Sequence, residues 1–268
     1  MSQELLPIAR AAARAGAHAL RDMWGRELNV QNKAQFDYVT EADRKSERAV
    51  SEVIKAARPD SLILAEESAG DWARMAEQPG LMWIVDPLDG TTNFIHGFPH
   101  VAVSVAACQD GQLAAGVVRD VLRGEEFSAA AGRGAWLNGN ALRVSEVRDP
   151  GSALLLTGFP FRIKPRLKAY LALFSELFDQ FSGIRRAGSA ALDMAYVAAG
   201  RAEGFWELGL MPWDVAAGVV LVKEAGGIVS DFSGGGDYLW QEEMVAGNPF
   251  VHPVLQRACA RHLRPGQT

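Results

Sequence analysis

Apolar residues near the start of the chain recur every three or four positions, the spacing of an amphipathic helix. From Gln3 to Gly25 they share one side, and basic residues share the other. A second helix is expected from Thr40 to about Ala57. Thr40 is a good N-cap residue and Asp43 supplies an acid three positions later, an approximate capping box. Residues 28–31 are typical of a short strand, and 32–38, which contains Lys33, is polar without clear periodicity and predicts a loop.

Short apolar runs then follow one another with turns between them. The runs that predict strands are 61–65, 81–85, 101–107, 113–119 and 125–130. Asp110-Gly111 and Arg123-Gly124 mark turns, and Asn138-Gly139 is a strong hairpin signal. Because strand follows strand, we expect an antiparallel sheet with flanking helices, an α+β pattern.

After Asp149-Pro150-Gly151 the pattern changes to alternating strands and helices. Expected strands are 153–157, 184–187, 203–207, 228–230 and 243–246, and expected helices are 165–181, 189–199, 213–225 and one beginning near Pro249. This alternation is typical of an α/β arrangement. We therefore expect an α+β half over residues 1–150 and an α/β half with a mixed sheet over residues 151–268, packed as one compact unit.

Composition narrows the class of protein. The 268 residues are 49% hydrophobic and 22% charged, as in an ordinary soluble protein, and the net charge of −5 argues against direct nucleic-acid binding. No apolar stretch is long enough for a membrane span. Cys108 and Cys259 form no disulfide framework, which suggests the reducing cytoplasm.

Candidate chemistry centres on the octet Asp86-Pro87-Leu88-Asp89-Gly90-Thr91-Thr92-Asn93. It follows the apolar run 81–85, so the predicted strand ends on a carboxylate, and Pro87 opposes further pairing. Asp89 lies three residues after Asp86, so a tight turn directs both carboxylates to one point. Glycine, hydroxyls and successive N–H groups follow, which suits a divalent cation that holds a phosphate. An Asx-rich turn that caps a helix is the alternative.

Other acids also stand at predicted strand ends or helix starts. They are Asp43, the pair Glu66-Glu67 and Asp214. Taken singly, Asp43 and Asp214 are explained as helix caps, and adjacent glutamates are usually solvated. A cluster of these acids with Asp86 and Asp89 would repel itself unless cations were present. An all-oxygen donor set selects Mg²⁺ or Mn²⁺ over Zn²⁺, and two or three such ions form the usual arrangement for displacement at phosphorus.

The octet, followed by Phe94, resembles the signature of the inositol monophosphatases, members of the lithium-sensitive, Mg²⁺-dependent phosphatase superfamily. Residues 213–218, Trp-Asp-Val-Ala-Ala-Gly, resemble the second motif of that family. Ala65-Glu66-Glu67-Ser68 resembles its Gly-Glu-Glu-Ser, with alanine in place of glycine, and residues 39–43 also match. From 185 to 248 the sequence is similar to the bacterial inositol-1-monophosphatase branch.

The resemblance implies roles for individual residues. The first Mg²⁺ would be bound by Glu66, Asp86 and the Leu88 carbonyl, the second by Asp86, Asp89 and Asp214, and a third, weaker ion at Glu66. Thr91, hydrogen-bonded to Asp43, would with Glu66 orient and deprotonate the attacking water.

Substrate contacts are implied in the same way. Backbone N–H groups of Gly90, Thr91 and Thr92 would hold the phosphate. The residues near the sugar alcohol would be Asp89, Gly188, Ser189, Ala190, Glu207 and Asp214. Lys33 matches a loop lysine of the family only approximately.

The family resemblance also implies a five-layer αβαβα sandwich, a homodimer, and hydrolysis of myo-inositol 1-phosphate to myo-inositol and phosphate. Other small phosphate esters remain alternative substrates: fructose 1,6-bisphosphate, histidinol phosphate or a nucleotide. A further alternative is a role as a partner of the transcription antitermination machinery, as in some bacterial relatives. We expect a cytoplasmic, lithium-sensitive enzyme with no membrane partner.

Overall fold

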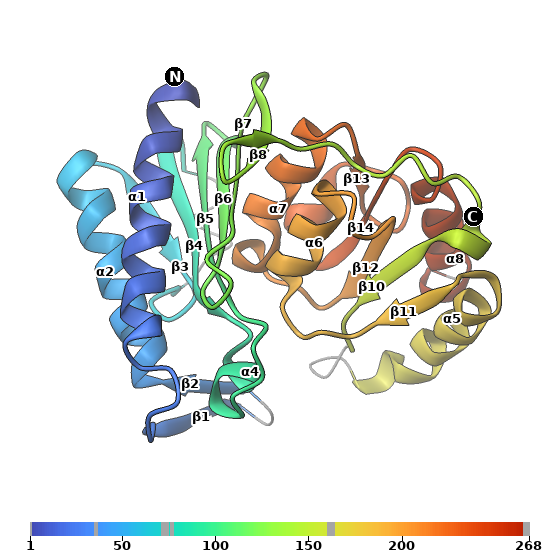
Figure 1. The fold of residues 1–268 in the computed structure, drawn as a ribbon, viewed down its shortest axis with the longest axis horizontal. Coiled ribbons are helices and arrows are strands. Elements are labelled where there is room, and N and C mark those ends of the chain that lie inside the picture. Colours follow the sequence, from blue (N-terminus) through green and yellow to red (C-terminus); the bar gives the residue numbers. More distant parts are fainter. Residues whose placement is uncertain (1, 35–36, 71–74, 76–77, 160–163, 265–268) are drawn as a thin grey trace.

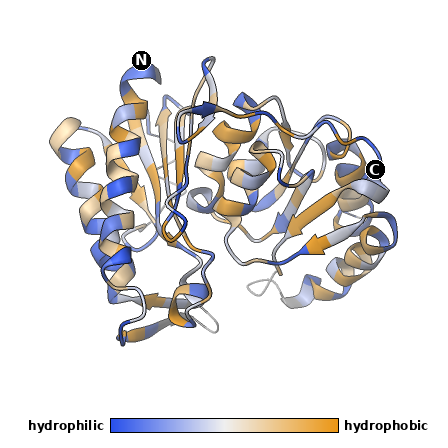
Figure 2. Ribbon diagram, viewed as in Figure 1, coloured by the Kyte–Doolittle hydropathy of each residue, from blue (hydrophilic) through white to orange (hydrophobic). Residues whose placement is uncertain are grey.

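The protein forms a five-layer αβαβα sandwich (Figure 1). The architecture is that of a computed structural model, which describes residues 2–34, 37–70, 75, 78–159 and 164–264. Helix pairs and sheets alternate through the molecule, so each sheet is covered by helices on both faces. Figure 2 shows that apolar residues concentrate on the strands and on the helix faces that contact them. This agrees with the layered fold expected from the sequence.

The first sheet has seven strands in the order β3-β4-β5-β6-β7-β8-β9. Their bounds are Leu62–Ala65, Leu81–Asp89, Ala102–Gln109, Gln112–Asp120, Glu126–Ala130, Gly134–Leu137 and Asn140–Ala141. All neighbours are antiparallel except β3 and β4, which are parallel. The predicted hairpin joins β8 to β9, and Asn138 and Gly139 both have positive φ, as a two-residue type I′ turn requires.

The outer helix layer consists of α1 (Ser2–Arg21) and α2 (Glu41–Ala57). Both are strongly amphipathic and bury their apolar faces against β4, β5 and β6. Gly16 allows the two helices to approach, because a Cβ at that position would lie 2.8 Å from Ser46 Oγ and from Val50 Cγ2. The predicted capping box is present: Thr40 is the N-cap of α2 and Asp43 is its N3 residue.

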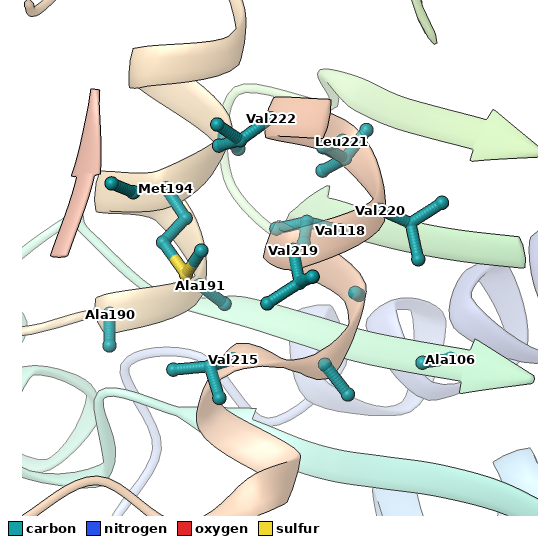
Figure 3. Packing of buried hydrophobic residues seen from close by; sticks show 14 of the residues in the cluster. Ala106, Val118, Ala190, Ala191, Met194, Val215, Val219, Val220, Leu221 and Val222 are labelled. Atoms are coloured by element: carbon teal, nitrogen blue, oxygen red, sulfur yellow. The ribbon is translucent and has the colours of Figure 1, made fainter. Parts of the chain in front are cut away.

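The central helix layer consists of α6 (Ala190–Ala198) and α7 (Pro212–Glu224), which are buried between the two sheets. Neither helix has a strong polar face, as expected for helices covered on both sides. Figure 3 shows the side chain of Met194 extending from α6 among the valines of α7. A Cβ at Gly116 of β6 would lie 2.7 Å from the Ala217 carbonyl oxygen, so glycine lets α7 rest directly on the sheet.

The second sheet has five strands in the order β11-β10-β12-β14-β13. Their bounds are Gly183–Arg185, Leu154–Thr157, Gly204–Leu208, Glu243–Gly247 and Ile228–Ser230. β10 pairs in parallel with β11 and β12, whereas β14 is antiparallel to β12 and β13, so the sheet is mixed as predicted. Helices α5 (Leu167–Gln180) and α8 (His252–Leu263) cover its outer face.

Two local expectations were wrong. Much of the predicted loop at 32–38 belongs to a two-stranded antiparallel sheet, β1 (Val30–Ala34) and β2 (Asp37–Thr40). Pairing between the two segments satisfies their backbone groups although the sequence lacks apolar alternation. The predicted strand 81–85 also continues to Asp89 as part of β4, with an irregularity at Pro87. The division near residue 150 remains a prediction.

Candidate active site

Nearly all of the predicted site residues line one pocket of about 140 Å³. It lies where the end of β4 and the short helix α4 (Thr91–Ile95) meet the first turns of α6 and α7 and the end of β12. The predicted residues on its wall are Glu66, Asp86, Leu88, Asp89, Gly90, Thr91, Thr92, Gly188, Ser189, Ala190, Glu207 and Asp214. Of the predicted set only Asp43 does not line the pocket, and it contacts Thr91 from behind.

A bulge in β4 presents the carboxylates of the octet. Asp86 pairs with Ser104 and Asp89 with Ala102, so one extra residue is accommodated in β4 between the two pairs. Leu88 N–H donates to Asp86 Oδ1 over 2.9 Å, an Asx-type contact that substitutes for ladder pairing. The Asx-type turn of the predicted alternative is therefore present at Asp86, but it does not cap the helix, because Gly90 is the N-cap of α4 and no side chain there accepts a capping hydrogen bond.

Burial and mutual repulsion dominate the electrostatics of the pocket. Burial raises the pKa of Asp86 well above its usual value, and the nearby charges of Glu66, Asp89 and Asp214 raise it further. Burial also raises the pKa of Asp89 to about 6, against the opposing hydrogen bonds from Ser189 and Ala191. The pKa of Glu207 is raised well above normal by burial, then by Asp193 and Asp214. These shifts show that the acids crowd one another.

The chemistry of the donor set fits hard divalent cations. Among the described lining residues there is no histidine or cysteine, and the acids supply oxygen donors only. Protein hydrogen bonds already engage one oxygen of several acids: Asp89 Oδ2 accepts from Ser189 Oγ and Ala191 N, and Asp214 Oδ2 accepts from Met211 N. In this arrangement no three His, Cys, Asp or Glu side chains of the described residues converge as a ready-made metal site. The fit of the pocket to divalent cations therefore rests on its oxygen donors and on the crowding of its acids.

Thr91 is held by two acceptors beneath the pocket. Its Oγ1 lies 3.0 Å from Asp43 Oδ1 and 3.2 Å from the Leu88 carbonyl oxygen. Asp43 is fully buried, and its other oxygen accepts from Thr40 N–H at 2.7 Å and from Thr40 Oγ1 at 2.6 Å. Burial raises the pKa of Asp43, whereas the hydrogen bonds from Thr40 and Thr91 lower it. The helix cap thus also orients Thr91, the contact expected between these residues.

Glycine geometry brings the octet close to the second sheet. Gly90 is the N-cap of α4 with a φ of 95°, and a Cβ there would lie 3.0 Å from the His100 carbonyl oxygen and 3.2 Å from that of Gly188. The Asn93 Nδ2 group donates to the carbonyl oxygens of His100 and Ala187 at 2.8 and 2.9 Å, and to that of Gly188 at 3.3 Å. Asn93 therefore connects segments nearly a hundred residues apart.

The structure adds lining residues that the sequence did not single out. They are Tyr38, Gly158, Phe159, Arg186 and residues 208–210. A Cβ at Gly158 would lie only 1.8 Å from Glu207 Oε1, so this glycine makes room for the acid. Gly158 and Phe159 directly follow β10, and the ends of strands are where sites gather in α/β sheets, the one signal that pointed to them. The side chain of Lys33 lies outside the described part of the structure.

Known proteins are similar to this chain over nearly its whole length. The model of the family described as "Inositol monophosphatase family" matches residues 1–267. The "Nus factor SuhB" of Pseudomonas aeruginosa is 48% identical over 267 residues, covering 98% of each chain. The protein of that name from Escherichia coli K12 is 46% identical over 224 residues, which cover 84% of this chain and 83% of the relative.

Solved structures also superpose on nearly the whole chain. The extragenic suppressor protein suhB from Bartonella henselae superposes with a TM-score of 0.90 at 40% identity, covering 98% of this chain and 99% of the other. The inositol monophosphatase from Anabaena (Nostoc) superposes with a TM-score of 0.86 at 37% identity, covering 97% and 96%.

Proposed function

Because the chain belongs to the inositol monophosphatase family, we propose that it is a Mg²⁺-dependent phosphomonoesterase that hydrolyses myo-inositol 1-phosphate by a metal-activated water. The family is of phosphatase type and metal-dependent. The substrate, the metal and the residue roles are our proposals. Fructose 1,6-bisphosphate, histidinol phosphate and nucleotides are the alternative substrates.

One observation carries the proposal: acids from four separate segments reach the same small pocket as the glycine and threonines of the octet. Glu66 follows β3, Asp86 and Asp89 lie on β4, Glu207 lies on β12 and Asp214 lies in the first turn of α7. Buried like charges repel one another and destabilise a fold unless cations or protons neutralise them. Clusters of this kind therefore mark functional sites.

We assign Glu66, Asp86, the Leu88 carbonyl, Asp89 and Asp214 as ligands of two or three Mg²⁺ ions, with Mn²⁺ as a substitute. Bound ions of this kind make hydroxide available near neutral pH and neutralise charge on the attacking and leaving oxygens. Thr91 positions the water through its contact with Asp43, and Glu66 takes up the proton. The N–H groups of Gly90, Thr91 and Thr92 hold the phosphate.

The alcohol of the ester would lie on the opposite wall. There Ser189 caps α6 and donates to Asp89, and Gly188, Ala190 and Glu207 stand beside it. Asp89 and Asp214 complete that wall, so they would serve both the ion and the alcohol. A polyol offers hydroxyl donors to these acids, which favours a sugar alcohol over an apolar leaving group.

The test is phosphate release from a panel of monophosphates with Mg²⁺. Asp86→Asn removes the acid shared by both ion sites and should reduce hydrolysis by about a hundredfold or more. Asp231→Asn is the matched control, because Asp231 is also buried but bonds Ser233 and Gly235 in a distant turn. Near wild-type hydrolysis by the Asp86 variant would refute the metal assignment. Inhibition by Li⁺, expected from the family resemblance, is measured in the same assay.

A second candidate function comes from the relatives named Nus factor SuhB. A regulatory role with a transcription-factor partner would survive Asp86→Asn, whereas hydrolysis would not. A homodimer and a cytoplasmic location also remain proposals. No helix of the described residues is long and apolar enough to cross a membrane, and both cysteines are free and buried.

A further inference from the structure

Tyr170 of α5 lies behind the wall of the candidate active site that carries Glu207. Its side chain is fully buried, and it is not one of the described residues that line the pocket. Its hydroxyl nevertheless contacts the end of β10: it donates to the Gly158 carbonyl oxygen and lies within hydrogen-bond distance of Thr157 Oγ1. Gly158 does line the pocket, so Tyr170 reaches the site through one backbone carbonyl group.

The ring of Tyr170 contacts two more residues beside the pocket. It stacks on the Trp206 ring of β12 at an angle of 26°, with the ring centres 6.3 Å apart. The ring of Phe159, which lines the pocket, meets it edge-on with 5.7 Å between the centres. Trp206 directly precedes Glu207, and Phe159 directly follows Gly158. Tyr170 therefore contacts both of the chain segments that form this wall.

Thr157 connects the same two segments a second time. Its Oγ1 lies 2.8 Å from the Trp206 carbonyl oxygen and 3.3 Å from that of Gly158. Each hydroxyl carries one proton, so Thr157 and Tyr170 together offer two donors to these two carbonyl groups. Burial raises the pKa of Tyr170, which keeps its hydroxyl protonated as a donor. Without the Tyr170 hydroxyl, one donor would remain for both carbonyl groups.

Gly158 limits the space that the Glu207 carboxylate can occupy. A Cβ at this glycine would lie 1.8 Å from Glu207 Oε1 and 2.4 Å from Oε2, so the carboxylate packs directly against the glycine backbone. A rotation of the peptide group at Gly158 would therefore change the surface on which Glu207 rests. The hydrogen bond from Tyr170 opposes such a rotation, because a buried carbonyl that loses its donor must find another.

We propose that Tyr170 is a positioning residue for recognition of the alcohol part of the substrate. By holding the Gly158 carbonyl, it keeps the Glu207 carboxylate directed into the pocket, where that carboxylate accepts a hydrogen bond from a hydroxyl group of a polyol. This inference rests on the proposed function, because that function places the alcohol beside Glu207. A helix that contributes no lining residue among those described thus determines the preference for polyol esters.

A competing explanation is that Tyr170 is only a core residue, since it belongs to the apolar cluster between the second sheet and α5 and α8. Loss of a core contact changes the amount of folded protein, and so lowers the rate with every substrate alike. Loss of a positioning contact acts on substrates with hydroxyl groups for Glu207. Tyr170→Phe separates the two explanations, because phenylalanine keeps the ring contacts with Trp206 and Phe159 and removes only the hydroxyl.

The experiment measures kcat and KM with Mg²⁺ for myo-inositol 1-phosphate and for p-nitrophenyl phosphate, an ester without alcohol hydroxyls. Tyr170→Phe should raise KM for the inositol ester by roughly fivefold, the order of one hydrogen bond, with kcat changed by less than about twofold. Both constants for p-nitrophenyl phosphate should change by less than about twofold. Thr157→Val removes the second hydroxyl and should raise the same KM by a smaller factor, because Tyr170 still donates to Gly158.

Coupling to Glu207 is tested in the Glu207→Gln background, where adding Tyr170→Phe should raise KM by less than about twofold, because the carboxylate that it positions is gone. Tyr238→Phe is the matched control. It also removes one tyrosine hydroxyl, which lies 2.6 Å from Lys223 Nζ, and Tyr238 is not among the described lining residues. Both of its KM values should equal those of the wild-type chain.

Three results would overturn the inference. They are an unchanged KM for the inositol ester in Tyr170→Phe and Thr157→Val, an equal loss of kcat/KM with both esters, and a full effect of Tyr170→Phe in the Glu207→Gln background. If the wild-type chain hydrolyses neither ester, the proposed function itself fails, and this result is distinct from the other three.

Discussion

The contact between Asp43 and Thr91 gives the sharpest test of the site, and Asp43→Asn is the substitution that probes it. Asp43 accepts three hydrogen bonds: two from Thr40 on Oδ2 and one from Thr91 on Oδ1. The carboxamide of asparagine has one acceptor oxygen and one donor NH₂ group. If its oxygen keeps both contacts of the helix cap, its NH₂ group faces Thr91, and the polarity of that contact is reversed.

The expected loss of stability is modest. Two hydrogen bonds that change from charge-assisted to neutral weaken by about 1 kcal/mol each, so the free energy of unfolding should fall by at most about 2 kcal/mol. Relief from burying a charge, which raises the pKa of Asp43, offsets part of this. For a chain of this size the melting temperature should fall by roughly 4–8 °C or less, measured by thermal unfolding.

The loss of activity should be much larger. In the Asp43→Asn variant the Thr91 oxygen accepts from the introduced carboxamide, and its proton turns to the Leu88 carbonyl, the second acceptor already within reach. Thr91 then no longer positions the water, and kcat should fall by roughly a hundredfold or more at saturating Mg²⁺ and substrate. The kcat of Thr91→Val should fall by a similar factor, whereas Thr91→Ser keeps the hydroxyl and should keep most of the activity.

The double variant Asp43→Asn with Thr91→Val decides whether the two residues act as one unit. If they do, its kcat is no lower than that of the worse single variant, because the second change removes nothing further. A folded Asp43→Asn protein with wild-type kcat, or a double variant in which the two losses multiply, would refute the assignment of Asp43 to the orientation of Thr91.

Two further predictions follow from contacts described above. Burial raises the pKa of Asp89 to about 6, against an ordinary value of 3.8. Between these two pH values the folded chain therefore binds a proton at Asp89 that the unfolded chain does not bind. In EDTA, thermal stability should be higher below pH 6 and should fall as the pH rises through 6. Asp89→Asn should flatten this part of the profile, and an unchanged profile would contradict the shift. Gly116→Ala would place a Cβ 2.7 Å from the Ala217 carbonyl oxygen, so α7 must move from the sheet and the free energy of unfolding should fall by about 2–3 kcal/mol in urea unfolding. Gly236→Ala, which has open space around it, is the control, and equal stability of the two variants would disprove the close contact.

Local patterns in the sequence predicted much of the fold, because most elements have a clear period or a strong signal at their ends. The cap of α2 at Thr40 and the turn at Asn138-Gly139 are set by neighbouring residues alone, and both are present. The end of β4 was predicted too early because Pro87 opposes strand pairing. The bulge that accommodates Pro87 depends on the partner strand β5. The hairpin of β1 and β2 was missed for a similar reason: its stability comes from pairing and not from apolar alternation.

The residues of the candidate site differ in the same way: some are indicated by neighbouring residues in the sequence, and others only by the folded arrangement. The octet could be identified because its eight residues are contiguous and their chemistry is unusual. Arg186, Phe159 and Tyr38 could not, because they reach the pocket only through the way the two sheets and the β1–β2 hairpin are placed. Asn93 stood inside the recognised motif, yet its acceptors are carbonyls far away in the sequence, and no local pattern indicates them.

The bonding of Asn93 has a consequence for how the sequence can vary. All three of its acceptors are backbone carbonyl oxygens, and such oxygens are present whatever the side chain. Substitution at position 187 therefore leaves the connection in place, while substitution at position 93 removes it; His100 differs, because its buried ring also lies 3.7 Å from Asp193. A single amide thus concentrates the mutational sensitivity of this junction in one codon, and a survey of all substitutions at positions 93 and 187 should show that asymmetry directly.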